Sequence, residues 1–118
     1  MFRLENLAIW KLAVAYAKVT YKLPSGFPKE ETFALADQLR RSAVSISNNI
    51  AEGSGGTNKD FSNFLNMSVK STLETVNILY IAENQNYITN EARLIYYERA
   101  EEIIRKIRGL KNRLAISN

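Results

Sequence analysis

The stretch LADQLRRSAVSISNNIAEGSGG, residues 35–56, carries the pattern that decides the fold of this chain. Its apolar residues recur at three- and four-residue spacing, at Leu35, Leu39, Ala43, Ile46 and Ile50. At about 100° per residue, these side chains share one side of an α-helix, which is typical of a helix packed on a core. Gly53 follows the last of them, and glycine readily adopts the left-handed conformation that ends many helices. The stretch therefore predicts an amphipathic helix followed by a glycine-rich turn.

A polar pattern runs along another side of the same helix. It consists of Gln38, Arg41, Ser45, Asn49 and Glu52. Serine and asparagine compete with the helical backbone for hydrogen bonds, and each is less favourable than alanine by roughly half a kcal/mol. Two interpretations follow: a hydrogen-bonded network where helices or subunits meet, or a site for a ligand or nucleic acid. The network is favoured, because buried polar groups satisfied by their neighbours are far commoner than functional ones.

A helix is also expected at about residues 5–23, and it carries two apolar stripes. The stripes are Leu7, Trp10, Val14, Ala17 and Tyr21, and then Ile9, Leu12, Tyr16, Val19 and Leu23. One stripe is enough for a bundle core, so two stripes indicate that the helix is covered on two sides and favour self-association. The segment LPSGFP, residues 23–28, ends this helix with two prolines and a glycine. The next helix is expected to open near Lys29 and to cover about residues 29–52.

Two further helices are expected at about residues 58–85 and 90–115. Thr57 and Asp60 form a candidate capping box for the first, and Thr89 or Asn90 can cap the second. Their apolar stripes are Phe61, Phe64, Leu65, Val69, Leu73, Val76 and Leu79, and then Tyr96, Ala100, Ile103, Ile107, Leu110 and Leu114. Short connections join all four helices. The sequence thus predicts a single all-α domain over residues 1–118, an antiparallel up-down-up-down four-helix bundle.

The amino-acid composition excludes several kinds of catalytic and metal site. The 118 residues include no cysteine and no histidine, which removes thiol nucleophiles, histidine acid–base catalysis and nearly all structural zinc sites. We therefore expect no enzyme, no catalytic residue, no cofactor and no metal; Glu52, Glu74 and Glu83 are expected to form salt bridges or hydrogen bonds rather than a metal cluster. No apolar run approaches the ~20 residues that cross a bilayer. With no signal peptide and no cysteine, a cytoplasmic location is the simplest expectation.

The strongest charge feature is RKIRGLKNR, residues 105–113. Its basic residues are Arg105, Lys106, Arg108, Lys111 and Arg113, with no acidic residue between them. They suit the negative end of a helix and solubility, which is the ordinary role of such a run. They also suit a phosphate-backbone partner, above all if an assembly repeats them. The net charge of +4 is compatible with either role.

The segment DQLRRSAVSISNNIAEG, residues 37–53, closely resembles the signature of a bacterial family of four-helix-bundle proteins encoded in intervening sequences of 23S ribosomal RNA genes. LENLAIWKLAVAYAKVTYKL resembles the first helix of that family, FPKEETFAL the entry to its second helix, and KDFSNFLNMSVKSTLE its third helix. The similarity covers about residues 4–115. One position departs from it: Lys70 stands where the family usually has a small residue, so packing there is expected to be looser or the side more exposed.

The resemblance implies a four-helix bundle that assembles into a ring of five subunits and has no established enzymatic activity. A distant relation, the accessory protein of diversity-generating retroelements, forms a similar ring that binds nucleic acid and a reverse transcriptase. We therefore expect a non-enzymatic oligomeric scaffold or adaptor that binds RNA or DNA electrostatically. The alternative is a protein-only interaction module with no nucleic-acid role.

Overall fold

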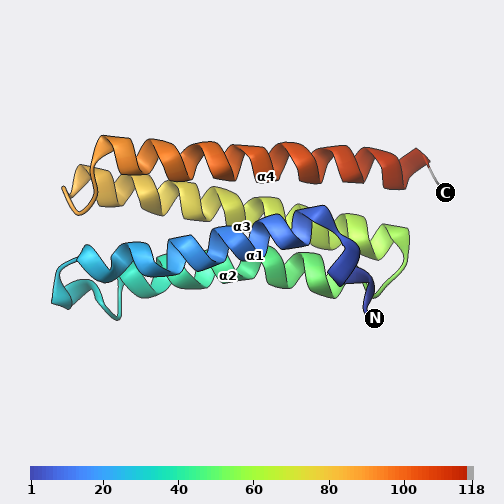
Figure 1. The fold of residues 1–118 in the computed structure, drawn as a ribbon, viewed down its shortest axis with the longest axis horizontal. Helices are drawn as coiled ribbons and strands as arrows, with labels where there is room; N and C mark the ends of the chain where they lie inside the picture. Colours follow the sequence, from blue (N-terminus) through green and yellow to red (C-terminus); the bar gives the residue numbers. More distant parts are fainter. Residues whose placement is uncertain (117–118) are drawn as a thin grey trace.

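The chain forms four long antiparallel α-helices, described over residues 1–116 by a computed structural model. They are α1 (Ala8–Lys22), α2 (Leu35–Gly53), α3 (Asn58–Asn84) and α4 (Asn90–Ile116). Figure 1 shows that the α1–α2 and α3–α4 connections lie at one end of the bundle, and the α2–α3 connection and both termini at the other. The described part of the chain contains no strand, which confirms the all-α prediction. None of its helices combines the length and the apolar character that a membrane span requires.

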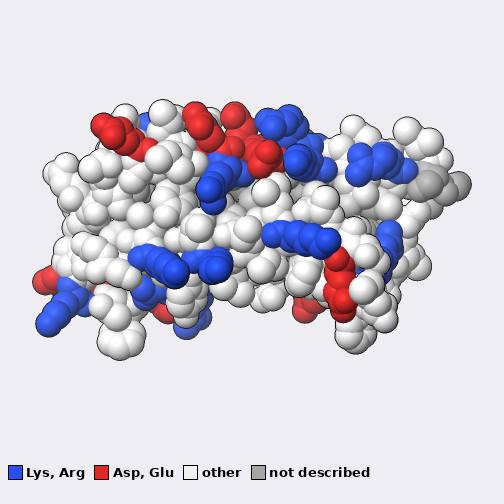
Figure 2. All heavy atoms as spheres, viewed as in Figure 1, with Lys and Arg blue, Asp and Glu red and all other residues white. Residues whose placement is uncertain are grey.

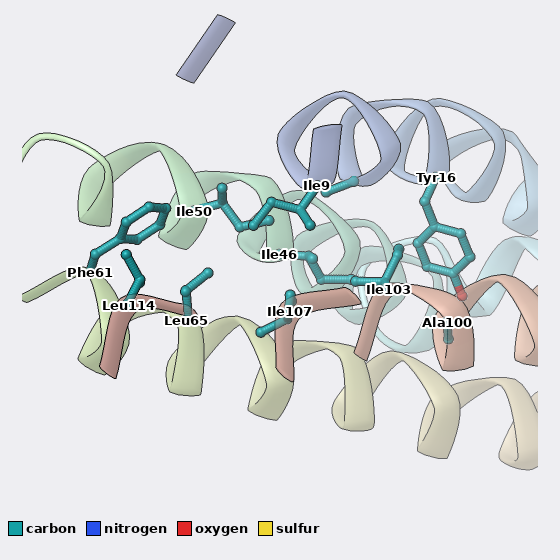
Figure 3. Close-up of a cluster of buried hydrophobic side chains, with 11 residues drawn as sticks. Ile9, Tyr16, Ile46, Ile50, Phe61, Leu65, Ala100, Ile103, Ile107 and Leu114 are labelled. Atoms are coloured by element: carbon teal, nitrogen blue, oxygen red, sulfur yellow. The ribbon is translucent and has the colours of Figure 1, made fainter. Parts of the chain in front are cut away.

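Among the described residues, the predicted apolar stripes converge on two buried clusters, and Figure 3 shows the larger one. Its buried members include Ile9, Ala13, Tyr16, Ile46, Ile50, Phe61, Leu65, Ala100, Ile103, Ile107 and Leu114. Of the two stripes expected on the first helix, the second supplies Ile9 and Tyr16 to this core. The other stripe is only partly covered: Val14 is 40% and Tyr21 54% exposed. α1 therefore has the expected second apolar side, and the bundle itself leaves that side partly exposed.

The entry to α2 differs from the prediction. This helix begins at Leu35 rather than near Lys29, and Lys29–Glu31 instead forms a short 3₁₀ helix, η3. The Tyr87 hydroxyl holds this turn by donating to Glu31 Oε2 at 2.8 Å. Ala34, at φ −121° and ψ −105°, then leaves the helical region before α2 starts. The contact from the α3–α4 connection is long-range in sequence, so local periodicity could not reveal it.

The first predicted helix is divided in a similar way. Arg3–Asn6 forms a 3₁₀ helix, η1, ahead of α1, and Leu23–Gly26 forms another, η2, after it. Pro24 lies in the first turn of η2, where its missing N–H costs no helical hydrogen bond. The expected span of 5–23 is therefore too long at its N-terminal side and continuous only as far as Lys22.

Gly53 has a different role from the expected left-handed cap. No glycine in the described residues has a positive φ, and the residue after Gly53, Ser54, stays in the right-handed region. A Cβ at Gly53 would lie 2.6 Å from the Phe64 Cβ and 3.0 Å from Phe61 Cδ1. The glycine is therefore needed because α3 passes directly over the last turn of α2.

The predicted helix starts of α3 and α4 are confirmed. The Asp60 N–H donates to Thr57 Oγ1, and the Thr57 N–H donates to Asp60 Oδ2, both at 3.1 Å. Thr89 rather than Asn90 caps α4, because the Ala92 N–H donates to Thr89 Oγ1 at 3.0 Å. These caps set the helix registers that place the side chains described next.

Candidate functional site

The polar stripe of α2 is divided between a helix contact and solvent. Ser45 and Asn49 are half-buried toward α3: the Ser45 and Ser71 hydroxyl oxygens lie 2.9 Å apart, and Asn49 Nδ2 donates to the Ser45 carbonyl at 2.9 Å. Arg41 is exposed and pairs with Asp37 of the same helix at 3.0 Å. The other two members of the stripe, Gln38 and Glu52, are exposed. The five predicted residues therefore do not converge on one site.

A row of buried hydroxyls between α2 and α3 was missed by the sequence analysis. Thr75 Oγ1 donates to Ser42 Oγ at 2.8 Å, and Ser68 Oγ donates to the Ile46 carbonyl of α2. These residues are buried, as is Thr72. The signal was available, since the small polar residues of α3 recur at three- and four-residue spacing. They allow α2 and α3 to approach closely and hydrogen-bond across the contact.

The basic run of α4 does not form one patch. Arg105 and Arg108 lie beside α3, where they line a groove together with Leu73. Lys111 Nζ donates to Asn66 Oδ1, also on α3. Because residues on a helix are about 100° apart, Lys106 and Arg113 point to a different side. The run therefore supplies cations to two surfaces of the bundle.

The side of the bundle between α1 and α4 carries two rows of basic side chains. Ala15 of α1 and both Arg99 and Glu102 of α4 line a shallow groove there, with a volume of about 310 Å³. Helical spacing of three, four and seven residues extends each row from these positions. The rows are Lys11, Lys18 and Lys22 on α1, and Arg99, Lys106 and Arg113 on α4, all exposed. Figure 2 faces this side and shows blue side chains following both helices.

The α1 row was missed by the sequence analysis, although its signal was present. The 15 residues of α1 include three lysines at Lys11, Lys18 and Lys22 and no acidic residue. Seven- and four-residue spacing places all three lysines along one side of the helix. Apolar periodicity drew attention to the stripes of this helix instead. We name the six basic residues of the two rows the α1/α4 basic side.

Charge is also segregated along α4. Its first half carries Glu91, Glu98, Glu101 and Glu102, whereas its second half carries only basic residues among the charged ones. Figure 2 shows the change from red to blue along the top of the molecule, where α4 lies. One ion pair crosses the boundary: Lys106 Nζ and Glu102 Oε2 are 3.9 Å apart.

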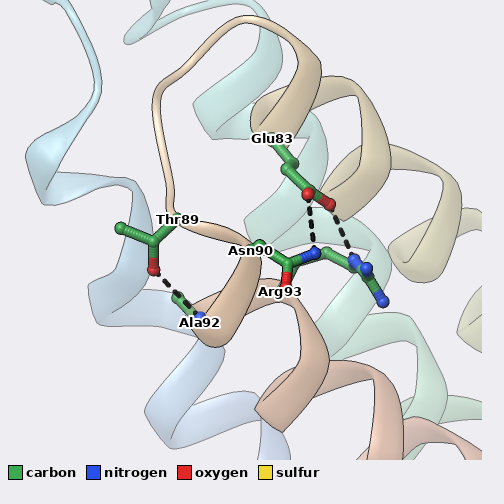
Figure 4. A network of polar contacts seen from close by, with 5 residues as sticks. All are labelled: Glu83, Thr89, Asn90, Ala92 and Arg93. Atoms are coloured by element: carbon green, nitrogen blue, oxygen red, sulfur yellow. Dashed lines mark hydrogen bonds and ion pairs between the residues drawn. The ribbon is translucent and has the colours of Figure 1, made fainter.

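Glu83 belongs to a polar cluster at the α3–α4 connection (Figure 4). Its carboxylate accepts from Arg93 Nε at 2.7 Å and from Asn90 Nδ2 at 2.9 Å. The hydrogen bond from Arg93, with a smaller contribution from Asn90, holds the pKa of Glu83 below its usual value. The Arg93 guanidinium also lies 4.6 Å from the ring centre of Tyr80. This cluster ties α4 to α3, and among residues 1–116 no group of acidic side chains could hold a metal ion.

The chain is similar to proteins of one family. Residues 5–109 match the family described as 23S rRNA-intervening sequence protein. A solved structure from Bacteroides thetaiotaomicron, a protein of unknown function from the S23 ribosomal protein family, is 25% identical to the chain, with a TM-score of 0.79. That similarity covers 88% of this chain and 98% of the other. Among curated proteins, no match to the chain is found.

Proposed function

The chain belongs to the 23S rRNA-intervening sequence protein family, and from that premise we propose that it is a non-enzymatic oligomeric scaffold that binds the backbone of RNA or DNA. The observation that carries this proposal is the α1/α4 basic side. Its two parallel rows of cations match the repeating negative charge of a phosphate backbone, which binds through Lys and Arg with little dependence on base sequence.

The cations of this side are available to a partner. Lys106 forms an ion pair with Glu102, but this pair is long, at 3.9 Å, and both side chains are exposed. Exposed pairs of this kind contribute about 0–1 kcal/mol and exchange readily with other anions. A phosphate can therefore replace the Glu102 carboxylate at little cost.

We further propose that the chain assembles into a closed ring of five subunits, which its family resemblance implies. The exposed apolar residues of α1, Val14 and Tyr21, support a contact with a second copy. A ring repeats the basic side around one axis and so increases affinity for a long polyanion. Light scattering on a size-exclusion column should give a mass near five times 13.4 kDa, and a monomer at all concentrations would contradict the assembly.

The experiment that tests nucleic-acid binding compares two variants of equal charge. The first replaces Lys11, Lys18 and Lys106 with Gln on the basic side. The second replaces Lys29, Lys59 and Lys70 with Gln, which are also exposed but belong to neither row. Each variant removes three positive charges, so a general effect of net charge is the same in both.

Affinity for a structured RNA and for duplex DNA should be measured by fluorescence anisotropy at low and physiological salt. We expect the first variant to bind at least tenfold more weakly than the second, since it removes direct phosphate contacts. Equal affinities for the two variants would contradict the proposed surface. If the unaltered protein binds neither nucleic acid even at low salt, the chain is instead a protein-only interaction module.

A further inference from the structure

The cations of the α1/α4 basic side lie in pairs across the groove between the two helices. Ala15 and Glu102 line this groove from opposite sides and so mark one level of the bundle. Lys11 is one turn from Ala15 toward the start of α1, and Lys106 is one turn from Glu102 toward the end of α4. Because α1 and α4 are antiparallel, both steps lead in the same direction along the bundle (Figure 1). Lys11 and Lys106 therefore lie at similar levels, one on each side of the groove.

A second pair, Lys18 and Arg99, lies one turn away from that level in the opposite direction. Both residues are exposed, and Arg99 itself lines the groove. The step from Lys11 to Lys18 equals the step from Lys106 to Arg99, and it corresponds to about 10.5 Å at 1.5 Å per residue. The two rows thus have the same spacing. A single strand offers one line of phosphates, whereas a duplex offers two and reaches both rows together.

The surface between the rows offers bases no ring on which to stack. Of the described residues that line the groove, only Tyr16 is aromatic, and it is 1% exposed. Tyr21 of α1 is 54% exposed, but it lines a separate groove with Val44 of α2. Proteins that bind single strands stack successive bases on exposed aromatic side chains. The bases of a single strand therefore gain little on the α1/α4 side, and the phosphates have to supply the affinity.

The shape of this side suits a shallow groove of a duplex rather than a deep one. A protein helix that reads the major groove of B-form DNA projects from its domain and enters the groove. Here two helices border a hollow of about 310 Å³ instead, so neither projects alone toward a partner. The minor groove of A-form RNA is wide and shallow and displays 2′-hydroxyls between its two backbones. A hollowed surface with cations on both sides matches that groove.

Glu102 places a hydrogen-bond acceptor between the rows. Its side chain is 38% exposed, and its carboxylate lies 3.9 Å from Lys106 Nζ. A phosphate that binds Lys106 replaces this carboxylate and leaves it free to accept a hydrogen bond. Because a carboxylate repels phosphate, a partner has to present a donor at this position. The 2′-hydroxyl is such a donor, and it is present in RNA and absent from DNA.

The acidic half of α4 limits the surface at one end. Glu91 and Glu98 are exposed and precede Arg99, so phosphates are disfavoured on that part of the helix. Figure 2 shows these charges as the change from red to blue along α4. The part that suits a backbone therefore extends from Arg99 toward Arg113, with Lys11 and Lys18 opposite its first half.

We infer that the α1/α4 basic side binds an RNA duplex across its minor groove, with one row of cations on each backbone and Glu102 accepting from a 2′-hydroxyl. This inference rests on the proposed binding of nucleic acid and names the class of nucleic acid that the surface selects. Contacts to phosphate and sugar carry no direct information on base sequence. The protein thus distinguishes duplex RNA from other nucleic acids without reading bases.

The first test compares three probes by fluorescence anisotropy on the unaltered protein. They are a duplex RNA of about 16 base pairs, a duplex DNA of the same sequence, and a single-stranded RNA with the same number of phosphates. We expect the duplex RNA to bind about tenfold more tightly than the single strand and several-fold more tightly than the DNA. Equal affinities for the three probes would overturn the inference and leave the proposed function in place. No binding to any probe, even at low salt, would overturn the proposed function itself.

The second test compares Glu102→Ala with Glu101→Ala. Each variant removes one negative charge from α4, but Glu101 lines the groove beside α3 instead. Glu102→Ala should bind duplex DNA more tightly and lose most of the preference for RNA, whereas Glu101→Ala should keep that preference. Alanine favours the helix, so thermal melts of both variants should stay close to that of the unaltered protein. The same RNA-to-DNA affinity ratio in both variants would overturn the role of Glu102.

A duplex RNA with 2′-fluoro sugars separates the hydrogen bond from the shape of the helix, because it keeps the A-form and the phosphates but lacks the donor. The unaltered protein should bind it several-fold more weakly than ordinary duplex RNA, and Glu102→Ala should bind the two equally. The rows are tested by Lys11→Gln with Lys18→Gln on α1 and by Arg99→Gln with Lys106→Gln on α4. Each pair of changes should weaken duplex binding more than single-strand binding. If only one row affects the duplex, the contact across the groove is overturned.

Discussion

Arg105 and Lys106 are neighbours in the chain but lie beside different helices. Arg105 lines the α3/α4 groove with Leu73, whereas Lys106 follows Glu102 by one helical turn, and Glu102 lies in the α1/α4 groove with Ala15. One residue step rotates the side-chain direction by about 100°. The basic run is continuous in the sequence, but its side chains therefore belong to two different surfaces of the bundle.

This division predicts separate effects of two double variants. Lys106→Gln with Arg113→Gln should weaken nucleic-acid binding at least several-fold and leave the oligomer mass unchanged, because both residues belong to the basic side. Arg105→Gln with Arg108→Gln should instead leave nucleic-acid binding nearly unchanged, since both residues line the groove beside α3 and lie outside the α1/α4 basic side. Anisotropy and light scattering on both proteins check the two effects. If the two double variants behave alike, the basic run acts as a single patch.

Gly53→Ala should destabilise the fold by about 1–2 kcal/mol. The new Cβ would meet the Phe64 Cβ at 2.6 Å, and the overpacking exceeds the gain in helix propensity from alanine. Gly26→Ala is the control, because nothing lies within 4 Å of its added Cβ. Urea unfolding measures both free energies. Equal stabilities of the two variants would show that α3 can move away from Gly53 without cost.

Thr75→Val should lower the free energy of unfolding by about 1 kcal/mol more than Thr72→Val. Both threonines are fully buried, and valine has nearly the same shape. Both hydroxyls contact a carbonyl of their own helix, Thr72 Oγ1 that of Ser68 and Thr75 Oγ1 that of Ser71. Thr75 Oγ1 also reaches Ser42 across the α2–α3 contact. Comparing the variants therefore isolates the hydrogen bond between helices. No difference between their urea midpoints would mean that the contact depends on packing alone.

The Glu83–Arg93 pair predicts a dependence of stability on pH. Hydrogen bonds from Arg93 and Asn90 lower the pKa of Glu83 in the folded protein from its ordinary value of 4.5. The stabilisation is therefore fully present above about pH 4.5 and is lost as the pH falls through the lower folded pKa. Thermal melts of the unaltered protein and Glu83→Gln should differ at neutral pH and converge in acid. Glu74→Gln, at an exposed position, should show no such convergence.

The sequence by itself determined the fold class, because apolar periodicity and caps are local. The stripe from Leu39 to Ile50, the Thr57–Asp60 capping box and the stripe from Ala100 to Leu114 all take the predicted positions. Predictions from the local sequence were wrong where a residue far away in the chain makes the deciding contact. Tyr87 holds the turn at Glu31 and delays α2, and Phe64 explains Gly53 better than any turn conformation does.

Only the tertiary structure decided which residues share a surface. Lys11 and Lys106 are far apart in the chain, and the antiparallel pairing of α1 with α4 brings their rows to one side. Leu73 and Leu79 belong to one predicted stripe, yet Leu79 is buried and Leu73 faces solvent. A helix pattern gives the direction of each side chain relative to its own axis. It cannot state which neighbouring helix covers that direction, because that depends on how all four helices pack together.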